Sequence, residues 1–244
     1  MEEIWLDQLA RNKDLTLDDV ERSVAYAKDL MQGLTKLKTF EQGVTVFGSA
    51  RLLETDPYYQ KARELGQRLA RAGHPVITGG GGGIMEAANR GAHEVGGRSI
   101  GFNIELPHEQ SLNQYTTDNL QFHYFFARKV MLAFSAKVYV YFPGGFGTID
   151  EFSELLTLLQ TGKIPRVPII LFGMEFWKPL DDFFRVKMEE EKKVISVGDR
   201  SLYAIADDIE YIVRVADSVM PRQINEVMQQ TANTAPADSW GKVL

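Results

Sequence analysis

The residues best suited to chemistry lie in one stretch, YFPGGFGTIDEF, at positions 141–152. Gly144, Gly145 and Gly147 separate an apolar run from two carboxylates, Asp150 and Glu151. A turn made of glycines exposes its backbone N–H groups, and a helix that begins just after it adds free donors and the positive end of its dipole. The stretch therefore predicts a phosphate site with a carboxylate close to it.

Two other loops are also rich in small residues, FGSAR at 47–51 and TGGGGGIMEAANRGA at 78–92. In an open α/β sheet, ligands bind at the carboxyl ends of the strands, where such strand-to-helix loops meet. One loop of this kind is most simply a tight turn. Because two or more of them are expected at the same end of one sheet, we interpret them as parts of a ligand site.

The common nucleotide fingerprints do not match these loops. A G-x-G-x-x-G pattern in the five-glycine run would need a glycine where Ile84 or Met85 stands. A Walker A loop fails because Ile164, and not Ser or Thr, follows Gly162-Lys163. The sequence therefore argues against NAD-type and P-loop binding.

Composition narrows the class of protein further. The chain has 244 residues, of which 44% are hydrophobic, and a net charge of -6, which argues against binding to a nucleic acid polymer. It has no cysteine and four scattered histidines, so we expect no metal site and a reducing, cytoplasmic location. The N-terminal residues do not resemble a signal peptide and no apolar run is long enough to span a bilayer, so no membrane association is expected.

The elements that must position these loops follow from the hydrophobic pattern. Residues 17–37 have apolar side chains at helical spacing, and from residue 43 onwards short apolar runs alternate with helical segments. They include a helix with Pro57 in its first turn and Gly73 at its end, a long loop after the strand RSIGFNIEL at 98–106, and a helix at 175–192. The pattern predicts an α/β protein, a Rossmann-like doubly wound parallel sheet with helices on both faces. We expect an N-terminal helical extension at 1–40, the nucleotide-binding domain at 41–220, with its last helix at about 206–219, and a loosely ordered tail at 221–244.

Two of the glycine stretches resemble a known family. PGGFGTIDE matches the PGGxGTxxE motif, and GGGGGIMEAANRGA matches the GGGxGxMEAA segment, of the LOG (Lonely Guy) family. Its members are cytokinin riboside 5'-monophosphate phosphoribohydrolases, long mislabelled as lysine decarboxylases. The resemblance covers about residues 43–190, and VFGSAR, FFARKVM and LLTLLQTGK are similar to the longer bacterial branch.

The resemblance implies an enzyme that hydrolyses the N-glycosidic bond of a purine nucleoside 5'-monophosphate, releasing the base and ribose 5-phosphate. The partner is then a small AMP-like nucleotide, no cofactor is needed, and the protein forms a homodimer or a higher homo-oligomer. The expected catalytic residues are Arg128 and Glu151. The expected substrate-binding residues are Ser49, Gly80, Gly81, Glu109, Lys129, Gly144, Gly145, Phe146, Gly147, Thr148, Ile149, Asp150 and Thr157.

The chemistry fits these roles. Cleavage of an N-glycosidic bond builds positive charge on the ribose, which a fixed carboxylate can stabilise while it aligns a water molecule, and Glu151 is the candidate. Arg128 could hold the phosphate, orient Glu151 or support the departing base. Arg128 and Lys129 lie between apolar segments, so at least one of the two charges needs a partner.

A second function remains open at this point. A non-catalytic nucleotide-binding or phosphorylated-cofactor carrier protein could use the same fold and the same glycine loops. The presence of both Arg128 and Glu151 favours the enzyme. Lysine decarboxylation is a poor alternative, because it needs pyridoxal phosphate on a lysine and no lysine has a convincing setting for it.

Overall fold

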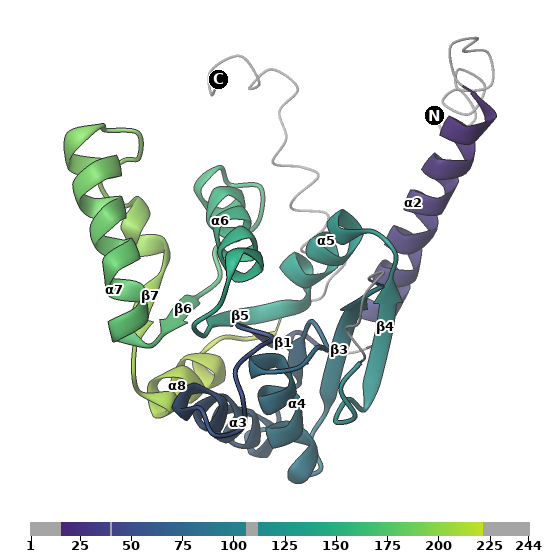
Figure 1. The fold of residues 1–244 in the computed structure, drawn as a ribbon, viewed down its shortest axis with the longest axis horizontal. Helices are drawn as coiled ribbons and strands as arrows, with labels where there is room; N and C mark the ends of the chain where they lie inside the picture. Colours follow the sequence, from purple (N-terminus) through teal and green to yellow (C-terminus); the bar gives the residue numbers. More distant parts are fainter. Residues whose placement is uncertain (1–15, 40, 106–111, 222–244) are drawn as a thin grey trace.

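The computed structural model describes residues 16–39, 41–105 and 112–221, and it arranges them around a seven-stranded parallel sheet (Figure 1). The strands lie in the order β4-β3-β2-β1-β5-β6-β7, so the order reverses between β1 and β5. The strands are β1 (Gly43–Phe47), β2 (Val76–Thr78), β3 (Ser99–Ile104), β4 (Asp118–Phe122), β5 (Ala136–Tyr141), β6 (Ile169–Phe172) and β7 (Ala204–Ala206). The expected doubly wound α/β class is confirmed.

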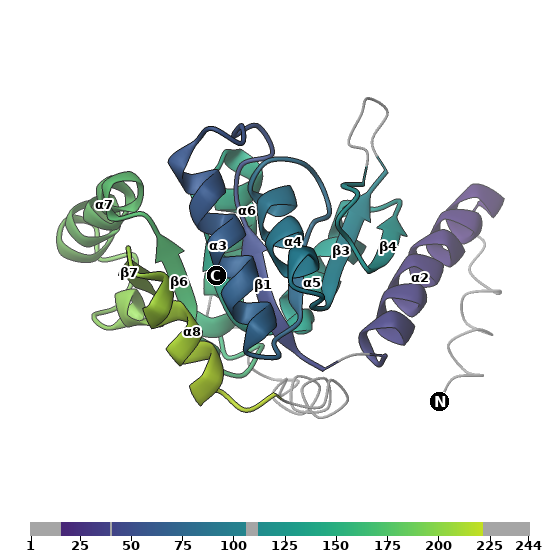
Figure 2. The same cartoon turned by 90° about the horizontal axis from the view of Figure 1, so that it is seen from below.

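Helices cover both faces of the sheet, as Figures 1 and 2 show. On one face lie α3 (Pro57–Arg71), α4 (Ile84–Glu94) and α8 (Ile209–Ser218). On the other lie α5 (Phe125–Ser135), α6 (Phe146–Gln160) and α7 (Met174–Phe183), with α2 (Leu17–Leu37) beside α5 and β4. A π-helix, η1 (Phe184–Glu191), continues α7, and a short 3₁₀ helix, η2 (Asp199–Leu202), precedes β7.

The central strands are buried on both faces, which is why they are apolar runs without polar alternation. Along β5, Val138 and Val140 pack with α3 and α4, whereas Tyr139 and Tyr141 belong to the core under α5 and α6. This follows from the two-residue period of a strand. The central strands, including their carboxyl ends, are therefore held in place by packing on both faces of the sheet.

Two helix boundaries follow the expected local chemistry. Pro57 occupies the first turn of α3, and the Asp56 side chain accepts a hydrogen bond from the Tyr58 N–H. Gly73 follows the end of that helix with φ +85°, a conformation that favours glycine. Both positions agree with the sequence prediction.

The N-terminal helix is only partly docked. Leu30, Leu34 and Leu37 pack against the core, whereas Val20, Val24 and Met31 remain exposed. The buried Asp29 side chain accepts hydrogen bonds from the backbone N–H groups of His123 and Tyr124. Burial alone would raise the pKa of the Asp29 carboxyl, but the hydrogen bonds from His123 and Tyr124 outweigh it and leave the pKa below its usual value.

Three sequence expectations about elements were wrong in detail. The last helix begins at Ile209, not near residue 206, because residues 204–206 form the edge strand β7 and Asp208 caps the helix. The helix expected over 175–192 changes to π-helical geometry at Phe184. A strand, β4, lies within the segment expected to be a long loop.

Residues 1–15 and 222–244, which hold the outer parts of the expected extension and tail, lie outside the described residues. Within the described ranges, none of the helices has both the length and the apolar character that crossing a membrane requires.

Candidate functional site

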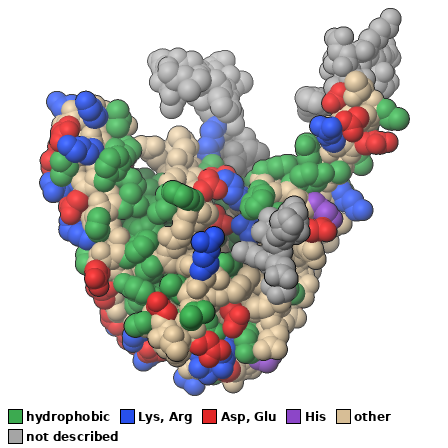
Figure 3. Space-filling model, viewed as in Figure 1, with side chains coloured by type: hydrophobic (Ala, Val, Ile, Leu, Met, Phe, Trp, Pro, Cys, Tyr) green, Lys and Arg blue, Asp and Glu red, His purple; other side chains and the backbone are tan. Residues whose placement is uncertain are grey.

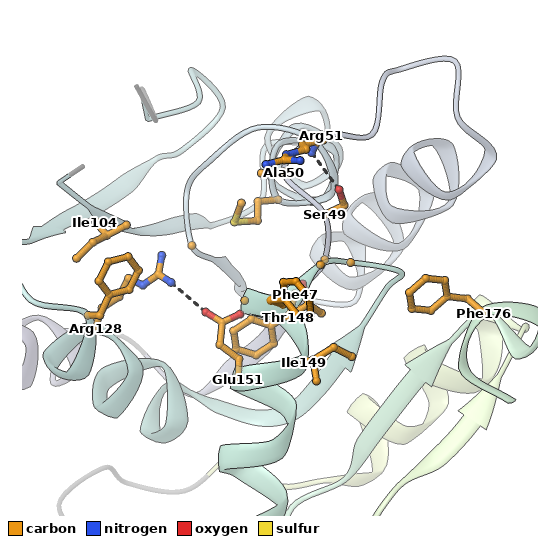
Figure 4. Close-up of a pocket in the computed structure, with 18 residues that line it drawn as sticks. Phe47, Ser49, Ala50, Arg51, Ile104, Arg128, Thr148, Ile149, Glu151 and Phe176 are labelled. Atoms are coloured by element: carbon orange, nitrogen blue, oxygen red, sulfur yellow. Dashed lines mark hydrogen bonds and ion pairs between the residues drawn. The ribbon is translucent and has the colours of Figure 1, made fainter. Parts of the chain in front are cut away.

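A cavity of about 740 Å³ opens at the carboxyl ends of β1 and β5, the point where the strand order reverses (Figure 4). Ligand sites of open α/β sheets lie at such points. The lining residues are Phe47, Gly48, Ser49, Ala50, Arg51, Gly79, Met85, Ile104, Phe125, Arg128, Gly144, Gly145, Phe146, Gly147, Thr148, Ile149, Glu151 and Phe176.

Backbone hydrogen bonds join the three glycine-containing loops into one rim. The Ser49 N–H donates to the Pro143 carbonyl at 3.0 Å, which connects the loop after β1 to the glycine turn after β5. The Ile84 N–H donates to the Ser49 carbonyl at 2.9 Å, which adds the start of α4. The loops that the sequence singled out therefore meet at one place.

The glycine turn leads directly into α6 and leaves the helix start uncapped. Gly145 is the N-cap residue, and it has no side chain that could accept from the first N–H groups of the helix. A Cβ at Gly144 would lie 2.1 Å from the Thr148 hydroxyl oxygen, so glycine is required for the turn to pack against that buried residue. The free N–H groups and the helix dipole make this end of α6 suitable for an anion.

An ion pair lies beside this helix start. The Arg128 guanidinium contacts the Glu151 carboxylate at 3.0 Å, and the two side chains are only 11% and 15% exposed. Thr148 and Glu151 are three residues apart and share one face of α6, which places the carboxylate next to the anion site. Among the described residues, no group accepts a hydrogen bond from the buried Nε of Arg128.

The environment of Glu151 changes its titration. Burial raises the pKa of the Glu151 carboxyl, Arg128 opposes this, and the result is a pKa of about 7. A carboxyl group with this pKa changes its charge near neutral pH, as groups in acid/base or electrostatic catalysis often do. The wall of the cavity therefore carries a buried carboxyl group, Glu151, whose charge changes near neutral pH.

The remaining wall is largely apolar. Phe47, Met85, Ile104, Phe125 and Phe176 line the cavity, and the Arg128 guanidinium carbon lies 5.6 Å from the centre of the Phe125 ring. An apolar wall with a few polar groups suits a flat organic ring attached to a charged group.

The structure brings together most of the residues that the sequence named. Nine of them line the cavity: Ser49, Arg128, Gly144, Gly145, Phe146, Gly147, Thr148, Ile149 and Glu151. Lys129 and Asp150 do not line it, and they form an ion pair at 3.0 Å in which Lys129 also contacts Glu154. The prediction that Arg128 or Lys129 needs a partner is confirmed, since both have one.

Gly80 and Gly81 are not among the lining residues, but hydrogen bonds fix the position of their backbone. Their carbonyls accept hydrogen bonds from the backbone and the side-chain amide of Asn113, at 2.8 and 3.0 Å. Asn113 also donates to Asn89, which in turn accepts from the Thr78 hydroxyl. This buried polar network fixes the shape of the second glycine loop.

Thr157 is not brought into this cavity. It lines a separate cavity of about 170 Å³ with residues of η1 and η2. Thr157 lies nine positions after Thr148, which is about two and a half turns of helix, so the two side chains point in opposite directions. Glu109 lies outside the described residues.

Several lining residues were missed at the sequence level, notably Arg51, Ile104, Phe125 and Phe176. Arg51 ends a loop that was singled out and could have been included. The others belong to apolar runs in which a cavity-facing side chain cannot be told from a core one. In the described part of the chain, no three His, Asp or Glu side chains are grouped as a metal ion would require.

Comparison with known proteins gives consistent findings. Residues 85–215 match the family model described as possible lysine decarboxylase. A cytokinin riboside 5'-monophosphate phosphoribohydrolase from Rhodococcoides fascians is 27% identical over 174 residues, covering 69% of this chain and 86% of the relative.

Among solved structures, the molybdenum cofactor binding protein of Rippkaea orientalis is similar with a TM-score of 0.57 at 22% identity, covering 73% of this chain and 97% of the other. The molybdenum cofactor carrier protein of Chlamydomonas reinhardtii has a TM-score of 0.52 at 24% identity, covering 79% and 99%. At these identities the two structures establish a shared fold.

Proposed function

Because the chain belongs to the LOG family, whose model is described as possible lysine decarboxylase, we propose that it hydrolyses the N-glycosidic bond of a purine nucleoside 5'-monophosphate. The products are the free base and ribose 5-phosphate. A cytokinin nucleotide, with its substituted adenine, is one such substrate, as the name of the Rhodococcoides fascians relative indicates.

The observation that carries this proposal is the Arg128–Glu151 pair next to the uncapped start of α6. The 5'-phosphate binds to the N–H groups of the glycine turn and to the Thr148 hydroxyl. The ribose then lies beside Glu151, and the base extends towards the apolar wall. In this arrangement the phosphate contacts the glycine turn, the ribose contacts the carboxylate and the base contacts the apolar wall.

In the reaction, the bond between the base nitrogen and the anomeric carbon breaks and its electron pair leaves with the base. The ionised Glu151 carboxylate stabilises the positive charge that develops on the ribose and orients the water that attacks the anomeric carbon. The proton that this water loses goes to the departing base, which is released neutral. Arg128 holds Glu151 in place.

The test is a panel of purine nucleoside monophosphates and the matching nucleosides, assayed for free base and ribose 5-phosphate. We expect AMP or an N6-substituted AMP to be cleaved at least about 10²-fold more efficiently than its nucleoside, because each charge-assisted hydrogen bond to the phosphate contributes about 1.5–3 kcal/mol. Equal cleavage of adenosine would contradict the assignment of the phosphate site. Tight binding without any release of base would instead favour a nucleotide or cofactor carrier.

We also propose that the protein is a homo-oligomer. The apolar residues Val20, Val24 and Met31 on α2, and Phe125 and Phe126 on α5, are exposed. Figure 3 shows hydrophobic side chains gathered over the hollowed face between α7 and α5. Large exposed apolar surfaces mark contact sites between proteins. Light scattering at micromolar concentration is expected to give at least twice the chain mass of 27.5 kDa, and a stable monomer would refute this.

A further inference from the structure

One cation of the cavity has no assigned role. Arg51 lies on the loop after β1, across the cavity from the Arg128–Glu151 pair (Figure 4). Its backbone N–H donates to the Ser49 hydroxyl at 3.1 Å, which fixes the start of the side chain. Arg51 is an exposed residue, and none of the ion pairs among the described residues involves it.

The other cations near the cavity are already engaged. Arg128 is paired with Glu151, and Lys129 contacts Asp150 and Glu154. Arg51 is therefore the cavity-lining cation that is still available, within the described ranges, for a charge brought by a ligand.

The charge balance of the loaded site favours such a cation. A phosphate monoester has a charge of about -1.5 to -2 at pH 7. The ionised Glu151 cancels the charge of Arg128, and the α6 dipole supplies only about half a positive charge. Without a further cation the loaded cavity would hold a net negative charge of at least one, which a guanidinium beside the phosphate would neutralise.

We propose that Arg51 is the second cationic ligand of the 5'-phosphate and the residue that sets the preference for nucleotides over nucleosides. Its guanidinium closes on the phosphate from the side opposite the α6 start and donates two parallel hydrogen bonds to the phosphate oxygens. This inference rests on the proposed function, since it assumes that the phosphate occupies the glycine turn.

The experiment measures binding and turnover of AMP and adenosine for Arg51→Gln, Arg51→Lys and a control, Arg71→Gln. Arg71 is an exposed arginine at the end of α3, outside the cavity. For Arg51→Gln we expect AMP to bind about 10- to 100-fold more weakly, as expected for the loss of a charge-assisted contact. Adenosine binding should stay the same, Arg51→Lys should recover part of the loss, and Arg71→Gln should behave as wild type.

In turnover, the loss for Arg51→Gln should appear mainly in KM and less in kcat, because the phosphate does not react. AMP affinity within threefold of wild type, or an equal loss for adenosine, would overturn the role of Arg51. If the wild-type protein binds AMP but releases no base, the hydrolase proposal fails. The AMP affinities of the Arg51 variants, measured by calorimetry, then still test whether Arg51 binds the phosphate. If the wild-type protein does not bind AMP at all, both are overturned.

Discussion

Glu151→Gln is expected to reduce the turnover of a nucleoside monophosphate by about 10²- to 10⁴-fold, the usual contribution of a positioned carboxylate. Glutamine keeps the size of the side chain and can still accept a hydrogen bond from Arg128. It removes the negative charge that stabilises the developing cation on the ribose. Binding of AMP, measured by calorimetry, should persist because the phosphate contacts come from the glycine turn and Thr148.

The same substitution should stabilise the folded protein above neutral pH. The pKa of the Glu151 carboxyl is about 7 in the folded protein, compared with an ordinary value of 4.5. The folded state therefore binds this proton more tightly than the unfolded state does. The stabilisation that the bound proton gives is complete below pH 4.5 and is lost as the pH rises through about 7. The cost of the buried charge at pH 8 is on the order of 3 kcal/mol, so Glu151→Gln should unfold several degrees higher at pH 8 and show little gain at pH 4.5.

The pH dependence of wild-type turnover gives an independent check. If the ionised carboxylate is the active form, kcat should fall as the pH drops below about 7. Glu154→Gln is the matched control, since Glu154 lies one turn further along α6, is 36% exposed, and does not line the cavity. Near-normal turnover of Glu151→Gln, or an equal loss in Glu154→Gln, would remove Glu151 from the mechanism.

Gly145→Val is expected to abolish AMP binding, with at least about a 100-fold loss of affinity, while the protein remains folded. A Cβ at Gly145 would meet no heavy atom within 4 Å, and its φ of -91° suits any residue. The new side chain would fill open space beside the free N–H groups and keep the phosphate from reaching them.

Gly145→Ala provides a graded comparison and should lose less affinity than the valine variant. Gly144→Ala should behave differently, because its Cβ would clash with Thr148 and lower the unfolding temperature. Calorimetry with AMP, together with thermal unfolding of all three variants, separates these effects. A Gly145→Val protein that binds AMP normally would show that the phosphate does not lie on this turn.

The sheet and the glycine loops could be predicted from the sequence because their signals are local. A glycine turn between an apolar strand and a helix start, as at 143–148, indicates a ligand site when similar turns recur along the same chain. Arg128 and Glu151 were named through the family motif. Their contact, and the raised pKa of Glu151, depend on packing between α5 and α6, which periodicity does not describe.

The errors have equally specific causes. Thr157 was included because it follows the motif on the same helix, but it lies half a turn away from the face that bears Thr148 and Glu151. The strand at 204–206 is only three residues long, and the strand at 118–122 has several polar residues because it is at the edge of the sheet. Phe125 and Phe176 were indistinguishable from core residues, since exposure to a cavity leaves no mark in a sequence.

The hydrogen bond between Ser49 and Pro143 joins two loops that are far apart in the sequence, and this affects when the ligand site can form during folding. β1 and β5 are neighbours in the sheet, yet β2, β3 and β4 come between them along the chain. A growing chain that ends before β5 can pair β1 with β2 and β2 with β3, but it has no glycine turn to complete the rim. Such long-range parallel pairing forms slowly, and nucleotide stabilises only states that can bind it. The ligand therefore cannot assist the early stages of folding, and it protects the chain against unfolding only after β5 and α6 are in place.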